Sequence, residues 1–265
     1  MDRADSAGIA HDAEGSGFGF RTLRYLHNLG LPDLRSAIAV YAGGLHGAIH
    51  EDRIAVTSIG VTALMLVMDK LAGSGDEVVA VVSVWPNLTA QPVILGAQVR
   101  HVPLRPKHGL WWLNMDELLA TVKSRTRVLL VNAPNKPTGW TLTRAELQAM
   151  PAHCRSTGTW IVADEVDERV YFGGSGCAPF FVDFAPADDR LIVAQSFSKS
   201  FLMTPAGGWA GWCCPVVRKT PPASCWSSTA PARLSSRSAA GWRRWRWPTR
   251  WCHASRRTCK PAATA

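Results

Sequence analysis

The feature that most constrains the fold is a regular alternation of short apolar runs with longer segments of helical periodicity. The runs that we expect to be strands are Arg53 to Ser58, Glu77 to Val82, Gln98 to Pro103, Arg127 to Val131, Trp160 to Ala163 and Leu191 to Ala194. Strands separated by helices predict an α/β protein with a doubly wound, mainly parallel sheet. The nearly continuous hydrophobic character of Arg127 to Val131 is typical of a strand that is covered on both faces.

The segments between these runs carry helix signals. We expect helices at Pro32 to Tyr41, Val61 to Leu71, Met115 to Val122 and from Thr143 to about Cys154. The pairs Asn114/Glu117 and Thr143/Glu146 have the spacing of a capping box, which marks a helix start. With 265 residues and 47% hydrophobic content, the chain can form one large domain or two smaller ones with a proper core.

Polar, glycine and proline residues follow the expected strands at their carboxyl ends. These stretches are Ser58 to Gly60, Ser83 to Asn87, Asn132 to Gly139, Asp164-Glu165 and Ser196 to Lys199. Parallel sheets bind their ligands just beyond the carboxyl ends of the strands. We therefore expect one crevice to collect all five stretches.

Lys199 is the first candidate for chemistry in this crevice. It follows the apolar run Leu191 to Ala194 and stands between Ser198 and Ser200. A lysine that is desolvated at the end of a buried strand becomes a neutral amine, which attacks carbonyl groups. The alternative is a surface lysine in a strand-to-loop turn, and this stretch alone leaves both interpretations open.

Three ordered motifs extend the interpretation. They are Ala-Pro-Asn-Lys-Pro-Thr-Gly at Ala133 to Gly139, Ala-Asp-Glu-Val at Ala163 to Val166, and Ser-Phe-Ser-Lys at Ser196 to Lys199. With them, the chain from about Tyr25 to Trp212 resembles the class I/II aminotransferases, the aspartate-aminotransferase-like branch of the pyridoxal-phosphate enzymes of fold type I. Three motifs in the right order are more specific than any one alone.

The resemblance implies a role for each matching residue. Lys199 matches the lysine that holds the cofactor aldehyde as an imine and then shuttles the α-proton. Asp164 matches the carboxylate that keeps the pyridine nitrogen protonated, so that the ring accepts electrons. Trp85 matches the aromatic residue that stacks on the ring. Without the resemblance, Asp164 would be a helix N-cap and Trp85 a core residue.

The resemblance also implies a phosphate site and a dimer. Gly60 and Val61 open a helix directly after a strand, where free N–H groups suit a phosphate. Ser196 resembles the serine that contacts the phosphate, and Asn135 lies in the cofactor-binding loop. Tyr25 sits where the family has a tyrosine that reaches the phosphate of the neighbouring subunit, which implies a homodimer with shared active sites.

Three positions depart from the family pattern. Lys136 stands where the family has asparagine and Asp167 where it has tyrosine, and both of those residues bond the phenolic oxygen of the cofactor. Lys136 is a cationic substitute in principle. Eight residues after Lys199, the arginine that clamps the phosphate is replaced by Gly207, or by Ala210 if Gly208-Trp209 sets the alignment. Losing that charge-assisted pair weakens cofactor binding by on the order of a few kcal/mol.

The character of the chain changes after Trp212. Residues 213–265 hold 11 of the 29 lysines and arginines, five tryptophans and none of the 20 acidic residues, so the net charge of +9 belongs to this tail. One interpretation is a basic, aromatic segment that binds nucleic acid or a membrane surface. We favour a disordered or out-of-frame stretch, because the change falls inside a family motif, and we expect truncation or a frame shift after about residue 212.

These observations give the following domain organisation. We expect a poorly defined N-terminal segment at 1–24, a large cofactor domain at 25–212 and the tail at 213–265, with the small domain of the family largely missing. No apolar run is long enough to span a membrane and the polar N-terminus is unlike a signal peptide, which predicts a cytosolic protein. No cysteine pair has zinc-ligand spacing, so the sequence predicts neither a metal site nor a disulfide.

The predicted function is the transfer of an amino group between an amino acid and a 2-oxo acid, with pyridoxal phosphate as cofactor and Lys199 as base. Three alternatives stay open. A lyase or decarboxylase on the same fold would use the same lysine and aspartate. Lys136, Asp167 and the missing arginine favour a catalytically impaired remnant. A nucleic-acid-binding role would depend on the tail alone.

Overall fold

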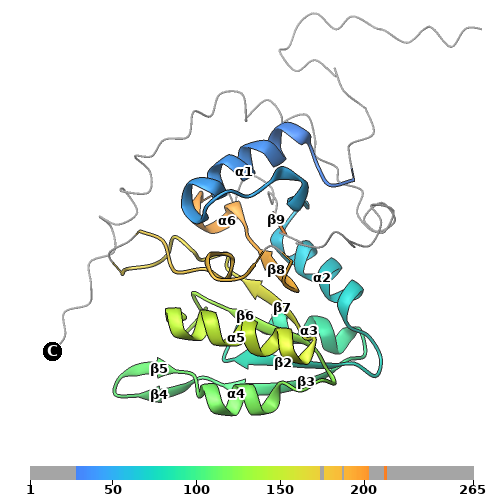
Figure 1. The fold of residues 1–265 in the computed structure, drawn as a ribbon, viewed down its shortest axis with the longest axis vertical. Helices are drawn as coiled ribbons and strands as arrows, with labels where there is room; N and C mark the ends of the chain where they lie inside the picture. The colour runs from blue at the N-terminus through green and yellow to red at the C-terminus, as the bar shows by residue number, and fades with distance from the viewer. Residues whose placement is uncertain (1–27, 174–175, 187, 203–211, 214–265) are drawn as a thin grey trace, which may run out of the picture. The chain divides into compact units, whose positions relative to one another are not determined.

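The structure is a computed structural model that describes residues 28–173, 176–186, 188–202 and 212–213. Its centre is a seven-stranded sheet with the strand order β1-β9-β8-β7-β6-β2-β3 and helices on both faces (Figure 1). The strands are β1 (Ala55–Val56), β2 (Glu77–Val82), β3 (Gln98–Pro103), β6 (Thr126–Asn132), β7 (Trp160–Asp164), β8 (Leu191–Ala194) and β9 (Trp212–Cys213), and a separate hairpin joins β4 (Arg105–Lys107) to β5 (Leu110–Trp112).

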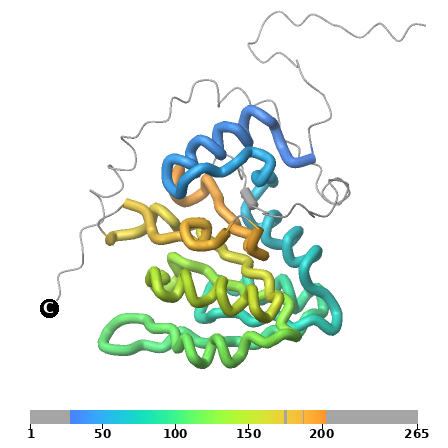
Figure 2. Tube along the Cα trace, viewed as in Figure 1, coloured from blue at the N-terminus to red at the C-terminus, as the bar shows by residue number. Residues whose placement is uncertain are grey.

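Helices and strands alternate along most of the chain, whose course Figure 2 traces. The helices are α1 (Pro32–His46), α2 (Gly60–Leu71), α3 (Pro86–Ile94), α4 (Met115–Thr121), α5 (Arg144–Thr157) and α6 (Phe197–Ser200), with short 3-10 turns η1 (Glu51–Arg53) and η2 (Phe181–Asp183). The predicted α/β architecture is therefore confirmed. None of the helices in the described ranges combines the length and the apolar character that crossing a membrane would demand.

The sheet is parallel from β8 through β7, β6 and β2 to β3. Only β9 runs antiparallel to its neighbours β8 and β1. The register places Asn132 opposite Asp164, and Asp164 opposite Ala194. The last residues of β6, β7 and β8 thus lie side by side at the carboxyl end of the sheet, which is the edge referred to below.

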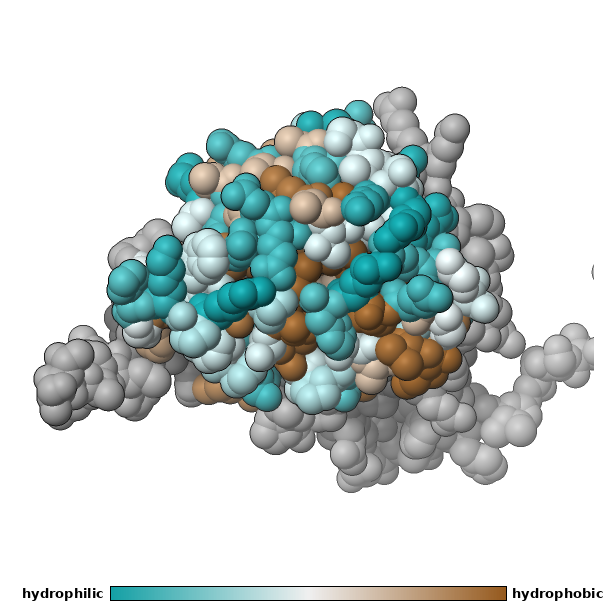
Figure 3. All heavy atoms as spheres, turned by 90° about the horizontal axis from the view of Figure 1, so that it is seen from below, coloured by the Kyte–Doolittle hydropathy of each residue, from teal (hydrophilic) through white to brown (hydrophobic). Residues whose placement is uncertain are grey.

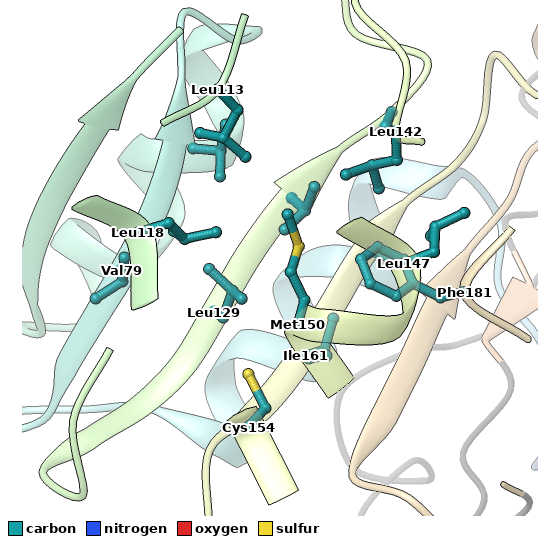
Figure 4. Close-up of a cluster of buried hydrophobic side chains, with 14 of the residues drawn as sticks. Val79, Leu113, Leu118, Leu129, Leu142, Leu147, Met150, Cys154, Ile161 and Phe181 are labelled. Atoms are coloured by element: carbon teal, nitrogen blue, oxygen red, sulfur yellow. The ribbon is translucent and has the colours of Figure 1, made fainter. Parts of the chain in front are cut away.

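Two apolar clusters cover the two faces of the sheet. Alternate residues of the central strands enter different clusters: Leu129 and Ile161 face one, and Leu130 and Val162 face the other. Leu147 and Met150 of α5 pack into the first cluster (Figure 4), whereas α2 and α3 pack into the second. Because both faces are buried, the central stretch of β6, from Val128 to Val131, is apolar at every position, which is what made this strand recognisable.

Helix ends follow local chemistry. Thr143 accepts a hydrogen bond from the backbone N–H of Glu146, whose carboxylate accepts from the backbone N–H of Thr143 at 2.7 Å, so the predicted capping box is present. The helix α5 ends at Gly158, whose positive φ of 77° suits glycine. Asn114 likewise accepts from the N–H of Glu117 at the start of α4.

Several elements were not predicted, among them α3, α6, β9 and the hairpin β4–β5, and one expected strand is shorter. The helix α3 starts at Pro86 and contains Pro92 in its interior, where proline argues against a helix. The hairpin β4–β5 turns at His108 and Gly109, both with positive φ, and its strands have only three residues each. The run Arg53 to Ser58 keeps just two strand residues because Arg53 ends the turn η1.

The hairpin strand β5 exposes large hydrophobic side chains. Leu110, Trp111 and Trp112 are all exposed, and the lower face of the molecule mixes apolar with polar side chains (Figure 3). At the other end of the described chain, β9 spans the expected boundary after Trp212. The remaining tail, residues 214–265, and the N-terminal segment lie outside the described residues, so the proposed division of the chain stays a prediction.

Candidate active site

The candidate site lies where β6, β7 and β8 end. Their last residues are neighbours across the sheet, and each strand leads into one of the polar loops that the sequence singles out. The side-chain amide of Asn132 donates to the backbone oxygen of Asp164 at 3.0 Å, which ties the ends of β6 and β7 together. The parallel topology therefore brings the three motifs to one edge, as expected.

Asp164 is a buried carboxyl group with little compensation for its charge. It is 4% exposed, and its Oδ1 accepts a hydrogen bond from the backbone N–H of Val166 at 3.3 Å. The pKa of Asp164 is raised to about 7, chiefly by burial and in addition by the charge of Asp167, while the Val166 bond and Lys199 act in the opposite direction. Such a group is stabilised by a cationic partner placed against it.

Lys199 lies in the single-turn helix α6, directly after β8. Ser196 caps this helix, since its Oγ accepts from the backbone N–H of Ser198 at 3.1 Å. The Lys199 ammonium is close enough for its charge to lower the pKa of both Asp164 and Asp167. Lys199 is exposed, which favours the surface-lysine alternative that the sequence left open, because the chain has already left the buried strand.

Gly60 and Ser196 form a small cradle, although they are far apart in the sequence. Gly60 is the first residue of α2, and Ile59 before it makes no side-chain cap. A Cβ atom on Gly60 would lie 3.5 Å from Cβ of Ser196 and 3.7 Å from its Oγ. The first intrahelical hydrogen bonds of α2 are donated by the N–H groups of Thr62 and Ala63 to the oxygen of Ile59. The N–H groups of Gly60 and Val61 lie before these bonds, in the position that binds anions at helix starts.

Trp85 follows β2 on the same edge of the sheet and precedes α3. It is half-buried and packs against the apolar cluster beneath α2 and α3. Trp85 therefore fits partly each of the two roles expected from the sequence, a core residue and a residue that stacks on a ring. Stacking on a cofactor stays a prediction. Tyr25, Gly207 and Ala210 lie outside the described residues.

The loop after β6 is held in shape by hydrogen bonds between its own residues. The amide of Asn135 donates to the backbone oxygen of Asn132 at 3.3 Å, and its Oδ1 accepts from the hydroxyl of Thr138 at 2.6 Å. Asn135 is buried, so its side chain holds the loop shape. Lys136, beside it, is exposed.

The two departures from the family pattern lie near each other in space. Burial raises the pKa of Asp167, and the charges of Lys199 and Lys136 lower it. Lys136 and Asp167 therefore occupy the same part of the site as Lys199, a grouping that their sequence separation does not reveal.

A second layer of buried acids was not singled out from the sequence. Glu165 accepts a bond from the backbone N–H of Phe181 at 3.0 Å, and burial raises its pKa well above the usual range. Glu168 accepts from the side-chain amide of Gln195 at 2.6 Å, next to Ser196. Four acids within the five residues 164–168 are the signal that could have pointed to this layer.

Comparison with known proteins gives a consistent family. The family profile described as aminotransferase class I and II matches residues 16–223. Arginine–pyruvate transaminase of Pseudomonas aeruginosa is 31% identical over 166 residues, which cover 62% of this chain and 41% of that protein. Aspartate aminotransferase of Pyrococcus horikoshii is 28% identical over 186 residues, covering 70% of this chain and 46% of that protein.

Solved structures agree. N-succinyldiaminopimelate aminotransferase from Mycobacterium tuberculosis superposes with a TM-score of 0.67 at 27% identity, over 77% of this chain and 52% of that one. Aspartate aminotransferase from Thermotoga maritima gives 0.66 at 27% identity, with the same coverage. The chain thus spans about half the length of the curated relatives that it matches.

Proposed function

The chain belongs to the class I and II aminotransferases, and from that premise we propose that it transfers an amino group between an amino acid and a 2-oxo acid, with Lys199 as the reacting amine. The observation that carries the proposal is the convergence of Lys199 and the buried Asp164 at one edge of the sheet. The aminotransferases that the chain matches depend on pyridoxal phosphate.

The residues present fit this cofactor. Asp164 is a buried carboxyl group whose pKa is raised by its burial, and a protonated pyridine nitrogen is the kind of cation that would stabilise its charged form. The cradle between Gly60 and Ser196 would be partly filled by any side chain at position 60. The free N–H groups at the start of α2 suit a phosphate.

In the proposed arrangement, Asp164 holds the ring nitrogen, and Gly60, Val61 and Ser196 hold the phosphate. Trp85 lies along the ring. The cofactor, when bound, supplies an electron sink for the α-carbon of the substrate. Lys199 Nζ would hold the cofactor before substrate arrives and would then act as the base that takes the proton from the substrate α-carbon.

Lys136 and Asp167 place two charged side chains in the site where the family pattern has the neutral residues asparagine and tyrosine. We propose that the Lys136 ammonium takes over the hydrogen bond to the phenolic oxygen of the cofactor, and that Asp167 orients Lys136. The influence of Lys136 on the pKa of Asp167 supports their proximity. The same two residues favour the second candidate, a chain that binds cofactor without completing the transfer.

The first experiment identifies the lysine. Purified protein is mixed with pyridoxal phosphate, reduced with borohydride and mapped by mass spectrometry, and we expect the label at Lys199. Lys199→Ala should lose the label and the visible absorbance of the wild type, whereas Lys123→Ala, at an exposed lysine of the turn before β6, should keep both. A label spread evenly over the lysines would sink the proposed site.

A second experiment separates the three candidate functions. Protein loaded with pyridoxal phosphate, without borohydride reduction, is incubated with a panel of amino acids, followed by a panel of 2-oxo acids, and the products are measured. Amino-group transfer supports the aminotransferase, and loss of CO2 or of a side-chain fragment supports the decarboxylase or lyase. Cofactor binding without any product supports the impaired remnant. In that case, Lys136→Asn together with Asp167→Tyr should raise the yield of product.

The proposed assembly is a homodimer, because Tyr25 matches a residue that reaches the site of a second subunit. Sedimentation of the purified chain measures its oligomeric state. Tyr25→Phe should weaken cofactor binding in a dimer, and a monomer that binds cofactor equally well with either residue would contradict the shared site. The cytosolic location stays a prediction as well.

A further inference from the structure

Three potential metal ligands from separate parts of the chain lie close together. They are His46, the last residue of α1, Glu168 in the turn after β7, and Cys177 in the loop before η2. One donor atom from each lies within 4.8 Å of the other two. An imidazole nitrogen, a carboxylate oxygen and a thiol sulfur are the donors that Zn²⁺ uses in proteins.

His46 is arranged as a metal ligand would be. Its side chain is only 2% exposed, and its Nδ1 lies 3.1 Å from Oδ1 of Asp183. Its other ring nitrogen, Nε2, is buried and has no hydrogen-bond partner among the residues that the structure describes. If Nδ1 donates to Asp183, Nε2 carries the lone pair, and metal-bound histidines characteristically donate their second nitrogen to a carboxylate in this way. A buried nitrogen with no partner is unfavourable unless something occupies the place that it faces.

Glu168 is held in position from two sides. Its Oε1 accepts from the hydroxyl of Tyr41 at 2.9 Å, and its Oε2 accepts from the amide of Gln195 at 2.6 Å. Each carboxylate oxygen keeps a second lone pair, so these bonds orient the group without exhausting it. Supporting bonds of this kind are typical around metal ligands.

The surrounding charges also favour a cation. The charged groups that act on Cys177 are the carboxylates of Glu168, Asp183 and Glu165, and the guanidinium of Arg169. Arg169 is engaged elsewhere, since its Nε donates to the Tyr41 hydroxyl at 3.0 Å and its guanidinium lies over the Tyr41 ring. Three acids against one base give the cluster a negative balance.

We propose that His46 Nε2, Glu168 and Cys177 Sγ bind one Zn²⁺ ion, with water in the fourth position. Tetrahedral zinc places such donors roughly 3.3 to 3.6 Å from one another, so donors at the 4.8 Å limit would have to approach by at most about 1.5 Å. The ion would fasten the end of α1 to the segment between β7 and η2. No sequence motif indicates the site, because the three ligands come from separate segments.

The test uses the purified full chain, stripped of metal by a chelator and titrated with Co²⁺ as a coloured substitute for Zn²⁺. We expect one equivalent to bind, with the thiolate-to-cobalt absorption band, and Zn²⁺ to displace it. Cys177→Ser should abolish the band, and His46→Gln should lower the affinity at least tenfold. Asp183→Asn should lower it roughly 10- to 100-fold, the range found for supporting carboxylates.

Matched variants exclude other sites. The chain has further cysteines at Cys154 and beyond β8, so Cys154→Ala and a chain with serine at positions 213, 214, 225, 252 and 259 should keep the band. Lys199→Ala should keep it too, which separates this site from the cofactor site. A band that survives in Cys177→Ser, or that disappears with the tail cysteines, overturns the proposal. Circular dichroism of each metal-free variant checks folding, and Asp183→Asn decides the question if Cys177→Ser does not fold.

Discussion

Replacing Asp164 by asparagine tests whether the buried carboxyl group at the end of β7 is destabilised in its charged form when no cation lies against it. The substitution keeps the shape of the side chain and an oxygen for the Val166 N–H. It removes only the ability to ionise. The affected quantity is the free energy of unfolding of the cofactor-free protein as a function of pH.

The sign follows from the direction of the pKa shift. Burial raises the pKa of Asp164 from 3.8 to about 7 in the folded state. The stability associated with the protonated group is therefore fully present below pH 3.8 and is lost as the pH rises through about 7. One pKa unit corresponds to about 1.4 kcal/mol, so the total loss is on the order of 4 kcal/mol.

The assay is urea unfolding of cofactor-free protein between pH 4 and 8, followed by tryptophan fluorescence. We expect Asp164→Asn to equal the wild type near pH 4 and to exceed its stability increasingly toward pH 8. Asp116→Asn, at an exposed position in the first turn of α4, is the matched control and should show no such trend. A constant difference between Asp164→Asn and wild type across this range would refute the reasoning.

Adding pyridoxal phosphate should reverse the order of stability of wild type and Asp164→Asn. A protonated ring nitrogen compensates the carboxylate of the wild type but finds only an amide in Asp164→Asn. We therefore expect the cofactor to stabilise the wild type more than the variant at pH 8. Equal stabilisation of both would separate Asp164 from the ring, while leaving the pH result for the free protein intact.

Three further predictions concern the scaffold. Leu147→Ala, at a fully buried position of α5, should lower the free energy of unfolding by about 2–5 kcal/mol in a urea titration, and a loss below 1 kcal/mol would contradict the packing described. Thr143→Ala should remove the capping box of the same helix at a cost of about 1 kcal/mol, measured in the same way. Gly60→Ala should leave the unfolding midpoint unchanged or higher, yet weaken pyridoxal-phosphate binding in an absorbance titration, because its Cβ projects toward Ser196. Unchanged cofactor affinity would argue against the cradle.

Local pattern was enough to predict most of the sheet. Glu77–Val82, Gln98–Pro103 and Leu191–Ala194 are strands with the predicted ends. The apolar runs of Glu77–Val82 and Leu191–Ala194 report burial on both faces, which is a property of each segment by itself, whereas Gln98–Pro103 is largely exposed. Segments whose conformation depends on their neighbours were missed, as α3 shows, where Pro92 is accommodated inside a helix.

The candidate site was predictable in part for the same reason. Motifs at the ends of parallel strands have to meet, so the sequence could bring Asp164 and Lys199 together without coordinates. It could not give their environment. The sequence left open whether Lys199 is desolvated, and it is exposed, because solvent access depends on how α6 and the loops around it pack.

What the sequence determined by itself is therefore the α/β fold, the family and the edge of the sheet at which the chemistry would occur. What only the tertiary structure decided is which residues far apart in the sequence lie close together in space: Gly60 and Ser196, Lys136 and Asp167, and His46 with Glu168 and Cys177. The physical reason is that strand periodicity is local, whereas these contacts depend on the register of non-adjacent strands and on the packing of loops. A burial pattern along the chain carries no record of either.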